Sequence, residues 1–145
     1  MYTIGVFKDP AWADRGIAAL VADGFDPDSL SLIARVSDDA AQLVRTHIES
    51  DGETLELPRL GGVIAAGPLL STLRGSDRAL ESDGLASACA RAGFQSHDGY
   101  IFETLVERGG VLVAVQSEPR AADALARLHA YGGGNAAIGA WSGRV

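Results

Sequence analysis

Side chains that can exchange protons or bind a metal ion are grouped in one short segment, SHDGYIFETLVERGG, residues 96–110. If this segment is helical, Glu103 and Glu107 lie one turn apart and His97 and Asp98 lie in the first turn. Imidazole and carboxylate groups are common general acids, general bases and zinc ligands. The spacing therefore predicts an acid/base or metal site near His97, Asp98 and Glu103.

The same residues have an ordinary structural interpretation. Ser96 is a suitable helix cap, and Asp98 in the first turn complements the positive end of the helix dipole. The sequence contains no HExxH motif and no paired CxxC motif, and His47 and His129 lie far away in the chain. We therefore predict that the chain binds no metal and no cofactor, and we keep a small enzyme as the alternative to a non-catalytic protein.

Two other motif classes are missing from the sequence. The glycine-rich segment at 61–67 lacks the Lys-Ser/Thr ending of a phosphate-binding loop, and the one at 131–139 follows a predicted helix instead of opening one. No serine stands in a GxSxG frame. Nucleotide binding and serine hydrolase chemistry are thus not expected.

Composition predicts a single globular domain. The chain has 145 residues, of which 47% are hydrophobic and 21% charged, and its net charge is -7. This acidic balance argues against a nucleic-acid partner. The lone cysteine, Cys89, cannot form an internal disulfide, and the first ten residues do not resemble a signal peptide, so we expect a cytoplasmic location.

An internal repeat predicts the architecture. The segment from residue 3 to 24 can be aligned without gaps with the segment from 111 to 132, which places Ile17 opposite Leu125. Each copy reads as a strand, a helix-capping residue (Asp9 or Ser117), a helix that buries one face, and a terminating glycine. A second strand is predicted after each helix, at 29–36 and 135–142.

The fold expected from this repeat is an α+β ferredoxin-like sandwich, with helices on one face of a four-stranded antiparallel sheet. The single domain, 1–145, then consists of a βαβ unit at 1–37, a helical insert at 38–109 and a second βαβ unit at 110–145. Within the insert, the alternating segment ETLEL at 53–57 can form a short strand, and we expect residues 60–70 to form a helix packed on its glycines. A peripheral membrane contact through 60–70 is an alternative, although the stretch is far shorter than the about 20 residues that span a bilayer.

Two longer segments, IGVFKDPAWADRGIAALVADGFDPDSLSLIA at 4–34 and YIFETLVERGGVLVAV at 100–115, resemble the general stress protein 17M-like domain family, also called heat-induced stress protein domains. The resemblance covers about half of the chain. It implies a small bacterial α/β domain linked to stress responses, and it supplies no catalytic residues.

The predicted function is a non-catalytic regulatory, ligand-sensing or interaction module that binds a small molecule or a protein. A homodimer is expected, because strands that are apolar on both sides need cover on both faces of the sheet. Trp12, Phe7 and Val113 are the candidate interface residues.

Overall fold

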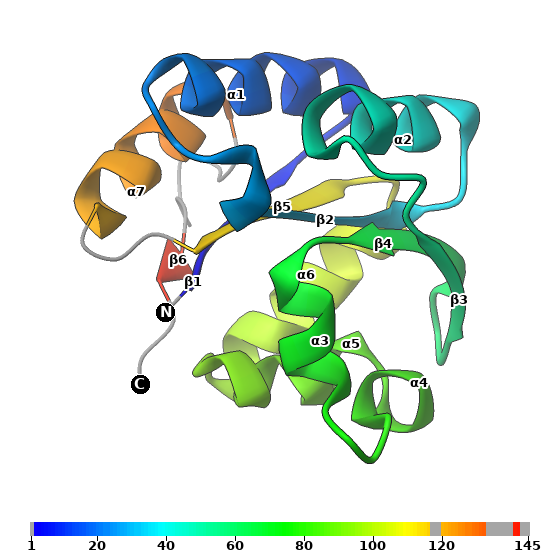
Figure 1. The fold of residues 1–145 in the computed structure, drawn as a ribbon. Helices are drawn as coiled ribbons and strands as arrows, with labels where there is room; N and C mark the ends of the chain where they lie inside the picture. Colours follow the sequence, from blue (N-terminus) through cyan, green and yellow to red (C-terminus); the bar gives the residue numbers. More distant parts are fainter. Residues whose placement is uncertain (1, 117–119, 133–140, 143–145) are drawn as a thin grey trace.

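An antiparallel sheet forms the centre of the fold (Figure 1). The structure, a computed structural model, describes residues 2–116, 120–132 and 141–142. The strands are β1 (Tyr2–Phe7), β2 (Leu30–Arg35), β3 (Glu53–Leu57), β4 (Gly61–Ala66), β5 (Val111–Gln116) and the two-residue β6 (Trp141–Ser142). Their order across the sheet is β3-β4-β2-β5-β1-β6.

Helices connect and cover the strands. The α-helices are α1 (Pro10–Ala22), α2 (Asp38–Leu43), α3 (Pro68–Arg74), α4 (Ala79–Asp83), α5 (Leu85–Ala88), α6 (Ser96–Glu107) and α7 (Ala121–Ala130). Short 3-10 turns are η1 (Pro27–Ser29) and η3 (Cys89–Ala92), and α2 continues into a π-helical turn, η2 (Val44–Ile48). The mixed α+β class predicted from the sequence is confirmed.

The internal repeat is reflected in the register of β1 and β5. β1 and β5 pair so that Gly5 lies opposite Val113, and these two residues are also equivalent in the repeat. The pairing of Ile33 with Leu112, between β2 and β5, has its repeat counterpart in the pairing of Trp141 with Ile4, between β6 and β1. The two copies are therefore related by an approximate two-fold axis through the Gly5–Val113 pair.

Helices cover both faces of the sheet, whereas the sequence predicted helices on one face only. In Figure 1, α1, α2 and α7 lie above the sheet, and α3 to α6 lie below it. Each layer closes its own apolar cluster. Phe7 and Val113 were candidates for an interface with another molecule, but both are fully buried under the upper helices. The expectation of a second copy loses its stated reason, because the chain itself covers both faces.

The segment 38–109 is not purely helical, since it contributes β3 and β4 to the sheet. Residues 60–70, predicted to be a helix, form β4 and the start of α3. Side chains on both faces of β4 are buried, with Val63 below the sheet and Ile64 above it. A strand buried on both faces has the same continuous apolar pattern as a short buried helix, which explains the error. Burial of these side chains also removes the apolar surface that the membrane alternative required.

Capping residues explain where the upper helices begin. Asp9 caps α1, with its Oδ1 accepting a hydrogen bond from the Trp12 backbone N–H at 3.0 Å, and Pro10 occupies the first turn. Ser37 caps α2 in the same way. In α6, Ser96 is the first helical residue, and Gln95 occupies the cap position without a side-chain bond.

The two repeat helices are not buried equally. Ile17 of α1 is fully buried, but its counterpart Leu125 in α7 is only half-buried, and α7 instead buries Ala124 and Leu128. The cap predicted at Ser117 and most of the predicted strand at 135–142 lie outside the described residues.

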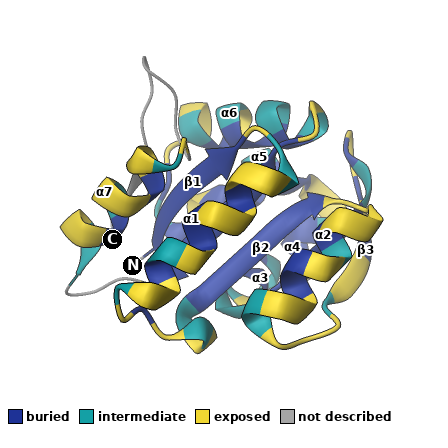
Figure 2. Ribbon diagram, turned by 90° about the horizontal axis from the view of Figure 1, so that it is seen from above, coloured by how far each residue is buried: buried dark blue, intermediate teal, exposed yellow. Residues whose placement is uncertain are grey.

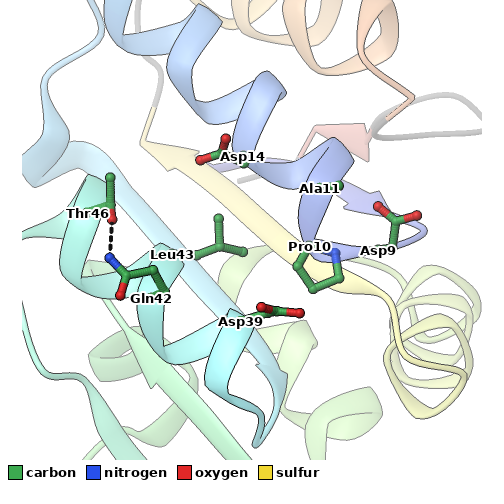
Figure 3. A pocket seen from close by; sticks show the side chains of 8 residues that line it. All are labelled: Asp9, Pro10, Ala11, Asp14, Asp39, Gln42, Leu43 and Thr46. Atoms are coloured by element: carbon green, nitrogen blue, oxygen red, sulfur yellow. Dashed lines mark hydrogen bonds between the residues drawn. The ribbon is translucent and has the colours of Figure 1, made fainter.

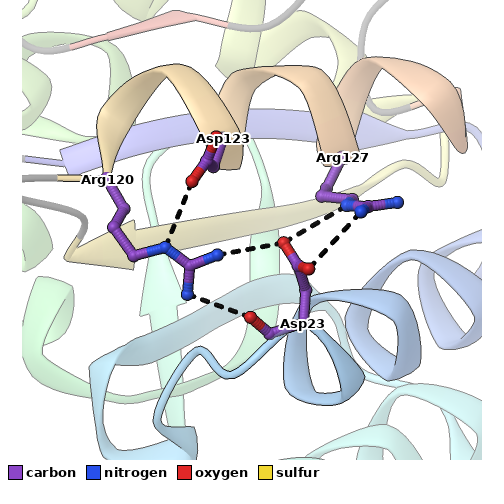
Figure 4. A network of polar contacts seen from close by, with 4 residues as sticks. All are labelled: Asp23, Arg120, Asp123 and Arg127. Carbon is purple, nitrogen blue, oxygen red and sulfur yellow. Dashed lines mark hydrogen bonds and ion pairs between the residues drawn. The ribbon is translucent and has the colours of Figure 1, made fainter.

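Ion pairs fasten α7 to the end of α1 (Figure 4). Arg120 donates from Nη2 to the Asp23 carboxylate at 3.0 Å and from Nη1 to the Asp23 carbonyl at 3.0 Å. Arg127 reaches the same carboxylate at 3.3 Å. The Arg120 guanidinium also lies 4.1 Å from the centre of the Phe25 ring. This clamp supplements the limited apolar contact that α7 makes.

Candidate functional site

The predicted acid/base residues lie on one helix, α6, but differ in how far they are buried. His97 is exposed, Asp98 is half-buried and Glu103 is buried, all on α6. No group of three or more His, Cys, Asp or Glu residues in the described part of the chain could hold a metal ion.

Glu103 has structural partners for both carboxylate oxygens. Its Oε2 accepts a hydrogen bond from the Ala86 backbone N–H at 3.1 Å, and its Oε1 lies 3.3 Å from Nη1 of Arg59. Arg59 also donates to both oxygens of Glu107, at 3.1 and 3.3 Å, and lies over the Tyr100 ring. The hydrogen bond to Glu107 is the main cause that raises the pKa of Arg59. These contacts tie the turn between β3 and β4 to α5 and α6.

Cys89 lies in the lower core, where its side chain is fully buried. Burial, with a smaller contribution from the Glu103 charge, raises the pKa of its thiol from 9.0 to about 12. In the unfolded chain the thiol ionises near pH 9, so ionisation favours unfolding as pH rises from 9 towards 12.

Between pH 8 and pH 10 the free energy of unfolding should fall in both proteins. We expect the fall in the parent to exceed that in Cys89→Ala by up to about 1.4 kcal/mol. Urea unfolding at the two pH values measures this difference. Equal losses in both proteins would show that the thiol ionises as readily in the folded state as in the unfolded state.

An open groove of about 500 Å³ lies between α1 and α2 (Figure 3). Asp9, Pro10, Ala11 and Asp14 come from the start of α1, whereas Asp39, Gln42, Leu43 and Thr46 come from α2 and η2. The two helices begin at the same end of the sheet, because β1 and β2 are both antiparallel to β5 and therefore parallel to each other.

The groove is acidic. It is lined by three carboxylates, and no lysine or arginine is among the described residues that line it. Each helix N-terminus contributes roughly half a unit of positive charge, which three carboxylates exceed. Of the three, Asp9 caps α1 and Asp14 lies 2.7 Å from Nε2 of His47, whereas Asp39 has no hydrogen-bond or ion-pair partner among the described residues.

The π-helical turn η2 forms part of the groove wall on the α2 side. It places His47 against Asp14 of α1, and the side chain of His47 is only 12% exposed. Thr46, also in η2, accepts a hydrogen bond from Nε2 of Gln42 at 2.9 Å. Such turns are rare and are often found at functional sites.

A second cavity of about 380 Å³ adjoins the groove and shares Pro10 and Asp39 with it. Its walls otherwise come from the end of β2, the start of α2 and the residues that open β5. They are mostly apolar, with Ala34, Val36 and Val111 among them, and Arg35 supplies the positive charge.

Sequence reasoning missed both cavities. Asp9 was recognised only as a cap, and Asp14 and Asp39 were not considered. The positions of Asp9 and Asp39 in the sequence could have indicated the groove. Each of them closely follows a predicted strand of the first βαβ unit, and the carboxyl ends of parallel strands lie at one edge of a sheet.

Comparison of the chain with models of protein families, with curated proteins and with solved structures finds no match. The resemblance to the general stress protein 17M-like family thus rests on the two sequence segments alone. No helix in the described part of the chain is both long enough and apolar enough to cross a membrane.

Proposed function

We propose that the protein is a non-catalytic binding module, and that the groove between α1 and α2 takes a small ligand with a positively charged group. The observation that carries this proposal is the groove itself, lined by three carboxylates and by no basic side chain among the described residues. Asp39 faces it without a polar partner from the described chain, so a ligand cation does not have to displace an existing bond.

The chemistry of α6 favours a module over an enzyme. Both oxygens of Glu103 are used in internal contacts, and His97 is exposed on the surface. A catalytic acid or base needs a neighbouring open space and a polar partner aimed into it. Neither of the two cavities described above is lined by His97, Asp98 or Glu103.

The proposal includes a ferredoxin-like core and membership of the bacterial stress-related family. Two observations support the ferredoxin-like core. In the strand order β2-β5-β1-β6, β5 lies between the two strands of the first βαβ unit and β1 lies between the two strands of the second. In addition, α1 packs beside α7. The insert then adds β3, β4 and a second helical layer. A regulatory or sensing role is consistent with a groove open to solvent.

Titration of the isotope-labelled protein with 3-methylbutylamine tests the groove by NMR. We expect backbone shifts at the starts of α1 and α2, and weaker binding of the neutral alcohol 3-methylbutanol. Asp39→Asn should weaken amine binding about two- to fivefold, which is the range expected for an exposed ion pair.

Asp28→Asn is the matched control, since Asp28 is an exposed carboxylate of η1 that does not line the groove. It should leave amine binding unchanged. Equal binding of amine and alcohol, or equal weakening by both variants, would contradict the proposed function.

A further inference from the structure

Arg35 is a positive group at the edge of the proposed site that lacks a carboxylate partner in the described part of the chain. It ends β2 and is exposed, and the one hydrogen bond of its side chain to the described residues runs from Nη1 to the Glu107 carbonyl at 3.2 Å. Six of the other nine arginines in the described chain pair with carboxylates, namely Arg59, Arg74, Arg78, Arg91, Arg120 and Arg127, whereas Arg15, Arg45 and Arg108 do not. The guanidinium of Arg35 therefore retains free N–H donors.

Arg35 and Asp39 line the same cavity without forming an ion pair with each other. The cavity thus has one positive and one negative side chain, and apolar residues that include Pro10 and Val36 also line it. The single hydrogen bond to the Glu107 carbonyl fixes one edge of the Arg35 guanidinium. A planar guanidinium held in this way is suited to bind a carboxylate through two parallel hydrogen bonds.

We propose that the ligand is a zwitterion of the amino-acid class, with its ammonium group on Asp39 and its carboxylate on Arg35. Its apolar side chain lies on the wall of the second cavity. This inference rests on the proposed function, which requires only the positive group, and it adds the second charge. The acidic groove between α1 and α2 continues from Asp39, so a longer or basic side chain has room there.

Three ligands that share an isobutyl group test the two charges separately. Leucine carries both, 3-methylbutylamine lacks the carboxylate, and 4-methylpentanoate lacks the ammonium group. We expect leucine to bind about three- to tenfold more tightly than the amine, and the acid to bind most weakly because of the nearby carboxylates. Dissociation constants from NMR titration give these ratios.

Arg35→Gln should abolish the preference for leucine over the amine, because leucine binding weakens whereas amine binding does not weaken. Arg35→Lys should retain part of the preference, because it keeps the charge but loses the bidentate geometry. Arg78→Gln, which removes an exposed arginine of another surface, should have no effect. Thermal melts of all three variants show whether the fold is retained.

The outcomes distinguish the two proposals. If leucine and the amine bind equally and Arg35→Gln changes nothing, the zwitterion is wrong and the cation-binding groove stands. If neither ligand shifts the starts of α1 and α2, both proposals are wrong. If the acid binds as tightly as leucine while the amine does not bind, Arg35 forms an anion site and both proposals are overturned.

Discussion

Phe7→Ala is expected to lower the free energy of unfolding by about 3–5 kcal/mol, a large share of the stability of a small domain. Phe7 ends β1 and is fully buried in the upper core. Its ring lies against Gly16 of α1, at a distance that leaves no room for a Cβ atom. Removal of the ring therefore leaves a cavity between the sheet and α1. Equilibrium unfolding in urea measures the loss.

Trp12→Ala is the matched control, because Trp12 is an aromatic residue in α1 that is 37% exposed. Its truncation should cost much less, although it also loses the contact with Arg15, whose guanidinium lies 5.0 Å from the ring centre. If Phe7→Ala instead weakened self-association at unchanged stability, its ring would lie in an intermolecular interface and not in the core described here.

Gly67→Ala is expected to cost about 3–5 kcal/mol, the sum of backbone strain and a steric clash. Gly67 joins β4 to α3 with φ +98, where side chains are rarely tolerated. An added Cβ would also collide with the backbone carbonyl of Leu30 in β2. Backbone atoms of a central strand cannot move aside cheaply. The urea midpoint and the yield of folded protein report the effect.

Gly61→Ala separates the two contributions. Gly61 lies at the other end of β4 with φ +73, but an added Cβ meets nothing within 4 Å. This variant should show the strain alone, about 1–3 kcal/mol. Equal losses at Gly61 and Gly67 would show that β2 does not approach Gly67 closely.

The strands and helices of the repeat were predictable because they are encoded locally. An apolar run, a capping residue, a helical stripe and a terminating glycine occur together at 3–24, and each has a physical meaning within a few residues. The equivalence of Gly5 and Val113 in the repeat also matches their pairing in the sheet.

The insert and the site were not predictable in this way. Residues 61–66 form a strand only because apolar layers cover both of their faces, which is a property of the tertiary structure. Similarly, Arg35 and Asp39 have significance only once the end of β2 and the start of α2 enclose a cavity with Pro10. No local pattern in the sequence marks such a meeting of separate segments.

The position of β1 between β5 and β6 has a consequence for the order of folding. Its sheet partners in the described structure are β5 and β6, although β1 is the first strand of the chain. During synthesis, β2, β4 and β3 can pair with one another while β1 still lacks both neighbours. Closure of a loop of about 100 residues costs entropy before that pairing is gained, so the sheet is completed late and folding is slow for a domain of this size. The apolar first strand must therefore be kept from wrong partners until β5 has emerged from the ribosome.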